Sequence, residues 1–190
     1  MLSTTDFNAQ AELQHELLSN ESLLWAGRPQ TGIAFRLSDV FLIPFSVFWC
    51  GFAIFWEFSV ISSGAPFFFM IWGIPFICMG LYMTIGRFIY DKYDRQKTWY
   101  GVTANRIIIK SGVFKTTVDT YAISNLSTLS IEEKANGTGS ILLSPQTSPF
   151  GALRINMGGW PAQKKQPDIE FIDNVRSVYN LILQQQSHTK

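Results

Sequence analysis

The chain has 190 residues and a formal net charge of +1, and 47% of its residues are hydrophobic while only 15% are charged. Soluble domains usually carry about 25% charged residues, so part of this chain is expected to lie outside water. A net charge so close to zero, without a basic face that carries interleaved aromatic residues, also argues against nucleic-acid binding.

Residues 1–37 are mostly polar and contain two predicted elements. The first is a helix at about 5–19, with apolar residues along one side, namely Phe7, Ala11 and Leu18. The second is a strand within LLWAGRP at 23–29, which ends at Pro29 because proline has no amide hydrogen for a sheet. We expect this strand to pair with the sheet formed by the later part of the chain.

The next block is almost free of charge. Residues 40–56 are uncharged, Glu57 follows, and residues 58–86 are uncharged again. A membrane span needs roughly 20 apolar residues, so the block is long enough for two helices. The sequence SSGAP supplies a turn between them. We therefore predict spans near 38–61 and 66–88, which together form a transmembrane α-hairpin over 38–90.

Basic residues flank this hairpin on one side only. Arg28 and Arg36 precede the first span, the connecting loop has none, and four basic residues follow the second span: Arg87, Lys92, Arg95 and Lys97. Basic residues concentrate in cytoplasmic loops, so both termini are expected in the cytoplasm. Each of the four is also a candidate contact to anionic lipid headgroups, worth about 1 kcal/mol.

Glu57 is the one carboxylate inside the apolar block, and we mark it as a candidate intramembrane polar site. Its expected place near the outer end of the first span favours an interfacial carboxylate beside Trp56, and an ion or proton role is the alternative. Small residues at helical spacing also predict close contact between helices, and these are Ser46, Cys50, Gly73 and Gly80.

Residues 91–186 have the pattern of an ordinary β-rich domain. Short apolar runs such as RIIIK at 106–110 alternate with turn signals, among them Ser111–Gly112 and an Asn-Gly turn at 136–137. The regular spacing of these strands predicts an antiparallel sheet or a small barrel. Residues 144–160 contain two prolines and three glycines, which leaves room for a loop and one or two edge strands.

A helix is predicted over 166–186, because Pro167 and Asp168 suit the first turn of a helix. One stripe of that helix is apolar and is expected to close the open side of the sheet: Phe171, Ile172, Val175, Val178, Tyr179 and Ile182. Residues 187–190 form a polar tail.

The sequence shows no catalytic constellation. His15 and His188 lie in polar segments, and Cys50 and Cys78 lie in the apolar block, where cysteine packs as a small hydrophobe. Neither a metal-ligand spacing nor a glycine-rich phosphate loop is present. We therefore expect no catalytic residues, no metal, no cofactor and no enzymatic activity.

Four segments together resemble the bacterial PH-domain-like family of membrane proteins. They are LLWAGRP at 23–29, SDVFLIPFSVFWCGFAIFWEF at 38–58, WYGVTANRIIIKSG at 99–112 and FIDNVRSVYNLI at 171–182. Within the third segment, Tyr100, Thr103, Arg106 and Gly112 match the family's pattern. The resemblance implies an α+β fold: a transmembrane α-hairpin with a PH-like, partly open antiparallel β-barrel capped by its C-terminal helix.

The resemblance also implies a binding platform at the bacterial inner membrane. We expect a multi-pass scaffold that presents its cytoplasmic β domain to a protein partner, to further copies of itself, or to the anionic membrane surface. The alternative is an oligomeric membrane pore or a transport-associated subunit, because two spans form a pore only when several copies assemble.

Overall fold

A computed structural model describes residues 6–32, 35, 39–113, 115–126, 128–143 and 168–189. The chain divides into two compact units. The β unit comprises Met1–Gly32, Tyr93–Thr147 and Lys164–Lys190, and the helical unit comprises Ile33–Lys92 and Ser148–Gln163. The fold is mixed α+β, with two long apolar helices and two antiparallel sheets. The edge strands expected at 144–160 lie outside the described residues.

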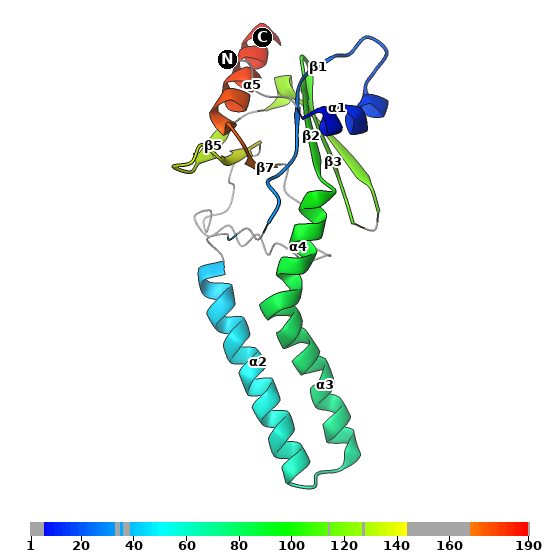
Figure 1. Cartoon of the computed structure of the whole chain (residues 1–190), viewed down its shortest axis with the longest axis vertical. Coiled ribbons are helices and arrows are strands. Elements are labelled where there is room, and N and C mark those ends of the chain that lie inside the picture. The colour runs from blue at the N-terminus through cyan, green and yellow to red at the C-terminus, as the bar shows by residue number, and fades with distance from the viewer. Residues whose placement is uncertain are drawn as a thin grey trace. The chain divides into compact units, whose positions relative to one another are not determined.

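Two antiparallel helices build the helical unit (Figure 1). The first is α2, Asp39–Ser62. The second begins as α3, Phe67–Leu81, passes through a π-helical turn, Tyr82–Gly86, and continues as α4, Arg87–Gln96. Both α2 and the continuous helix Phe67–Gln96 are long and apolar enough to cross a membrane.

The second helix continues beyond the predicted end at residue 88. The sequence after Gly86, RFIYDKYDRQ, is polar but contains no proline or glycine, so the backbone stays helical after the apolar stretch has ended. The predicted bound at residue 88 marks the end of the apolar segment. The helix itself continues until its residues no longer favour helical backbone conformation.

The two long helices meet at small residues. A Cβ atom placed on Gly80 would lie 2.9 Å from the Cα atom of Cys50, and one placed on Gly73 would lie 1.7 Å from Oε2 of Glu57. Ser46 on α2 is buried as well. This confirms the close contact expected from the small residues, because any larger side chain would separate the helices.

The first sheet of the β unit has four strands in the order β1-β2-β3-β4. Their bounds are Leu23–Gly27 for β1, Trp99–Thr103 for β2, Arg106–Ser111 for β3 and Thr117–Ala122 for β4. Strand β1 pairs antiparallel with β2, and Ala26 lies opposite Gly101. The strand expected at 23–29 therefore joins this sheet, although both long helices separate it from its neighbour along the chain.

The second sheet has three strands in the order β5-β6-β7, and neither sheet closes on itself among the described residues. The bounds are Ser130–Glu133 for β5, Gly139–Leu142 for β6 and Asp168–Ile172 for β7. Short 3₁₀ turns lie at Gln14–Glu16 and Ile123–Asn125.

The helix predicted over 166–186 begins later than expected. Residues Asp168–Ile172 form strand β7, and helix α5 covers Val175–Thr189, which includes most of the predicted polar tail. Phe171 and Ile172 therefore belong to a strand and not to the capping helix. Isoleucine and phenylalanine suit a strand, and backbone pairing with β6 outweighed the local helix-start signal.

Helix α5 still packs against the main core of the β unit. Val175, Val178 and Ile182 are fully buried on one face of the helix, and Tyr179 packs beside them partly buried. They contact residues from both sheets, including Ile107, Ile141 and Ile172. The predicted capping contact is present for these four helix residues.

A smaller core lies on the opposite face of the first sheet, under helix α1, Phe7–Leu13. Side chains alternate along β3, so Ile107 and Ile109 face the main core while Ile108 faces α1. The buried residues of α1 are Ala9 and Leu13.

The apolar side predicted for the N-terminal helix was therefore wrong. Phe7 is 85% exposed and Leu18 lies beyond the helix, itself mostly exposed. Asp6 caps the helix by accepting a hydrogen bond from the Asn8 amide, so the helix starts at Phe7. Gly101 on β2 then leaves space for Leu13, since a Cβ atom there would lie 2.9 Å from Cδ1 of Leu13.

Candidate functional site

Arg106, the first residue of β3, holds the segment that joins α1 to β1. Its Nε donates to Oε1 of Glu21 at 2.8 Å and its Nη2 donates to Oε2 of the same carboxylate at 2.5 Å. The Thr103 hydroxyl also donates to Oε1 of Glu21 at 2.8 Å. Thr103 and Arg106, which carried part of the family resemblance, therefore act here as a structural clasp.

The ion pair in this clasp shifts the pKa values of both of its groups. The hydrogen bond from Arg106 lowers the pKa of Glu21 to about 2, and the same bond raises the pKa of Arg106. Both groups are thus charged across the whole physiological range. A paired, mostly buried carboxylate of this kind stabilises the fold and leaves little capacity for a ligand.

Two of the four basic residues expected to contact lipid are engaged within the protein. Arg87 is 7% exposed, and its Nη1 donates to Oδ1 of Asp39 at 2.6 Å. Arg95 is 4% exposed, and its guanidinium donates to the carbonyl oxygens of Gln30 and Gly32. The prediction of lipid contact is therefore wrong for these two, because burial and internal hydrogen bonds use their charges.

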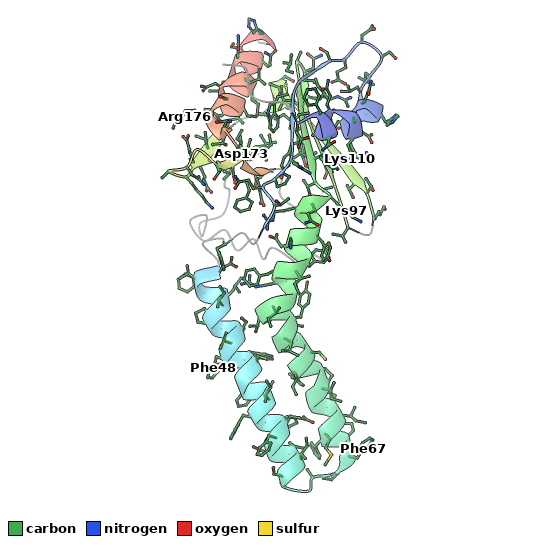
Figure 2. The ribbon with its side chains drawn as sticks, in the orientation of Figure 1. Phe48, Phe67, Lys97, Lys110, Asp173 and Arg176 are labelled. Atoms are coloured by element: carbon green, nitrogen blue, oxygen red, sulfur yellow. The ribbon has the colours of Figure 1, made fainter. Side chains whose placement is uncertain are left out.

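Lys92 and Lys97 remain at the surface. Lys97 follows α4 directly (Figure 2), and its Nζ lies 3.4 Å from the carbonyl oxygen of Val113 in the β3–β4 turn. Lysine ammonium groups at such exposed positions stay available to phosphate groups. For Lys92 and Lys97, contact with lipid headgroups stays a prediction.

Glu57 lies on α2 in contact with the backbone of Gly73 on α3. Its Oε2 atom is buried and has no hydrogen-bond partner among the described residues. A buried oxygen without a partner is costly, so this carboxyl is an unsatisfied polar group between the two long helices.

The β unit contains an open polar cavity of about 840 Å³. It is formed by the N-terminus of α1, the end of β1 with the residues after it, the β5–β6 turn and the β7–α5 junction. The lining residues are Asp6, Trp25, Gly27, Arg28, Pro29, Gln30, Thr31, Asn136, Ile172, Asp173 and Asn174.

Hydrogen bonds fix the polar lining of this cavity. Arg28 pairs with Asp6 through Nε at 3.0 Å, and its guanidinium lies over the ring of Trp99. Gln30 donates from its side chain to Oδ1 of Asp173 at 2.7 Å, and its backbone amide donates to the Phe171 carbonyl. The lining offers amide groups, a threonine hydroxyl, carboxylates and one guanidinium, which suits a polar ligand or a polar peptide surface.

Backbone strain lies beside the cavity. Phe171 has φ +53° and Asn174 has φ +50°, the left-handed region that non-glycine residues rarely adopt. Two cations lie near the Phe171 ring, with the Arg95 guanidinium 5.5 Å and the Lys134 ammonium 5.3 Å from its centroid. These cation–π contacts, together with the hydrogen bond from Gln30, hold the strained residue in place.

The sequence indicated little of this cavity. Its residues come from four separate segments, and the local turn signals at Asn136 and at the Asp173–Asn174 pair do not show that these segments meet. The Asp39–Arg87 pair was also missed, because it joins residues on opposite sides of the apolar block.

No family model, curated protein or solved structure matches this chain. The resemblance to the bacterial PH-domain-like family therefore has no support beyond the residues themselves.

Proposed function

We propose that this protein is a membrane-anchored binding module, in which the paired apolar helices fix a β domain at the cytoplasmic face of a bacterial inner membrane. The observation that carries this proposal is the pairing of β1 with β2 on either side of the apolar block. The chain leaves the sheet, forms both long helices and returns to the neighbouring strand. The β domain is thereby tied to its anchor at two points.

A PH-like architecture is the finer part of this proposal. The β unit combines a four-stranded antiparallel sheet, a three-stranded antiparallel sheet and a C-terminal helix, and α5 packs on the core that both sheets share. Such a fold serves as a rigid platform, and function lies in the surfaces that it presents. The polar cavity at the β7–α5 junction is the surface that we assign to a protein partner or to a second copy.

Crosslinking in intact cells followed by mass spectrometry tests this function. A photo-crosslinking residue at Thr31, in the cavity wall, should capture a defined partner or a second copy, whereas one at exposed Thr120 on β4 serves as the control. Recovery of uncrosslinked monomer alone from both positions would contradict the proposal.

The orientation needs a separate test. Thiol reagents that do not cross membranes should fail to label a cysteine introduced at exposed Lys134 in intact cells, and should label it after the membrane is opened. Labelling of intact cells would place the β domain on the wrong side of the membrane and would reject the cytoplasmic assignment.

A pore or transport-associated subunit is the second candidate, favoured by the unpartnered Oε2 of Glu57 between the long helices. An intramembrane carboxyl is a common component of ion and proton pathways. Ion flux into liposomes that disappears in Glu57→Gln would favour this function, and absence of flux from the unmodified protein would reject it.

A further inference from the structure

On helix α4 a set of charged residues is buried and a set of apolar residues is exposed, which is the reverse of a surface helix in a water-soluble domain. Arg87, Asp91 and Arg95 recur every four residues and are 7%, 6% and 4% exposed. Ile85, in the π-helical turn just before α4, and Ile89 and Tyr93 on α4 follow the same spacing and are 56%, 52% and 56% exposed. At about 3.6 residues per turn, the two sets fall on opposite sides of the helix.

The charged side is used internally. Arg87 bonds to Asp39 within the helical unit, and Arg95 bonds to the carbonyl oxygens of Gln30 and Gly32 within the β unit. These bonds require that side to face protein. They therefore fix the rotation of α4 about its axis and turn the apolar stripe outward.

The outward side changes in composition along its length. It begins with Ile85 and Ile89, continues with Lys92 and Tyr93, and ends with Gln96, which is exposed as well. This order matches a path out of a bilayer. The aliphatic residues suit the hydrocarbon, the tyrosine and lysine suit the headgroups, and the neutral polar residue suits water.

We infer that this outward face of α4 is a lipid-binding surface: Ile85 and Ile89 contact acyl chains, and Tyr93 with Lys92 contacts the headgroups. The inference rests on the proposed membrane anchoring and extends it to a segment where the chain is already polar in composition. Lipid is the occupant that fits, because the apolar helix α3 continues through the π-helical turn into α4 as one helix, Phe67–Gln96.

The residue that follows α4 adds a second lysine close to the proposed headgroup level. Strand β2 begins at Trp99, three residues after α4 ends at Gln96. If the headgroups lie at Tyr93, exposed Lys97 follows within about one helical turn, roughly 6 Å along the axis. The ammonium group of Lys97 then reaches the phosphate layer. Arg87 and Arg95 cannot make this contact, because their guanidinium groups form hydrogen bonds within the protein.

Site-directed fluorescence in lipid vesicles tests the surface. The full chain, with Cys50→Ala and Cys78→Ala, would carry one cysteine labelled with an environment-sensitive dye and be placed in vesicles of phosphatidylethanolamine and phosphatidylglycerol. The positions are Ile85→Cys, Ile89→Cys, Tyr93→Cys and Gln96→Cys, with Phe52→Cys on exposed α2 as the reference for acyl-chain contact.

Spin-labelled lipid should quench the dye at Ile89 at least about twofold more strongly than at Gln96, because only the former lies within hydrocarbon. Aqueous iodide should give the opposite order, and Tyr93 should respond most to a spin label near the headgroup. Ile85→Cys provides a second probe of the same face if Ile89→Cys does not fold.

Two results would overturn the inference. Iodide quenching at Ile89 equal to that at Gln96 would place this face in water, and protection of Ile89 from both quenchers would show that protein covers it. In either case lipid quenching at Phe52 would leave the membrane anchor intact. Loss of lipid quenching at Phe52 itself would instead reject the anchoring on which the inference rests.

Discussion

Arg106 and Glu21 form a two-point ion pair across 85 residues of sequence, with Nε and Nη2 of the guanidinium on the two carboxylate oxygens. Removing the guanidinium leaves a mostly buried carboxylate without its main partner. We expect Arg106→Ala to lower the free energy of unfolding by about 2–3 kcal/mol, measured by chemical denaturation in detergent micelles. Arg106→Lys should recover only part of this loss, because lysine cannot make both bonds.

Arg176 and Glu133 provide the matched control. They also pair through a guanidinium and a carboxylate, but Arg176 is exposed. Exposed pairs contribute little to stability, so Arg176→Ala should leave the unfolding transition almost unchanged. Equal effects of Arg106→Ala and Arg176→Ala would refute the special role of the Arg106 clasp.

Acid should weaken the same clasp. The pKa of Glu21 is about 2 in the folded chain and about 4.5 as a free side chain. Between these values the unfolded chain binds more protons than the folded one, so stability falls as the pH is lowered. The stability difference between the unmodified protein and Glu21→Gln should be complete above about pH 5 and shrink towards pH 2. A difference that does not change with pH would contradict the depressed pKa.

The contact between the long helices makes Gly80 sensitive to size. A Cβ atom on Gly80 would lie 2.9 Å from backbone of Cys50, so the helices must separate. We expect Gly80→Val to lower the thermal denaturation temperature in detergent, at a cost of about 1–3 kcal/mol. Gly51 on α2 has open space at the corresponding position, so Gly51→Val should cost much less. The reverse order would place the helix contact elsewhere.

Asn174 should respond to changes in backbone preference. Its φ of +50° lies in the region that glycine adopts freely and branched residues avoid. Asn174→Val should destabilise the β unit by about 1–2 kcal/mol, whereas Asn174→Gly should be neutral or slightly stabilising, both measured by denaturant unfolding. Asn8→Val, at an exposed position of helix α1, is the control for the side-chain change alone.

The sequence predicted features that depend on local pattern. The strand containing Ile107, Ile108 and Ile109 was predicted from its flanking turn signals, and a close helix contact was predicted from the spacing of small residues, although not which of them meet. Strand β7 was missed because Pro167 and Asp168 are equally good signals for the start of a helix. Only pairing with β6, which is not visible in the local sequence, decided between strand and helix.

The burial of Arg87 and Arg95 could not be predicted from the sequence either. A basic residue after an apolar span is normally interpreted as a surface charge. The partners of these two arginines are distant in the chain: Arg87 bonds to Asp39, and Arg95 bonds to the carbonyl oxygens of Gln30 and Gly32. The cavity lining was unpredictable for the same reason.

The order of elements along the chain also constrains how the protein is made. Strand β1 leaves the ribosome before both long helices, and its partner β2 leaves after them. At ~5–20 residues per second, β1 waits roughly four to fourteen seconds for β2. The four-stranded sheet is therefore completed only after both long helices have been synthesised. A chain released before β2 would expose an unpaired strand together with two long apolar helices, which are features that chaperones and proteases recognise.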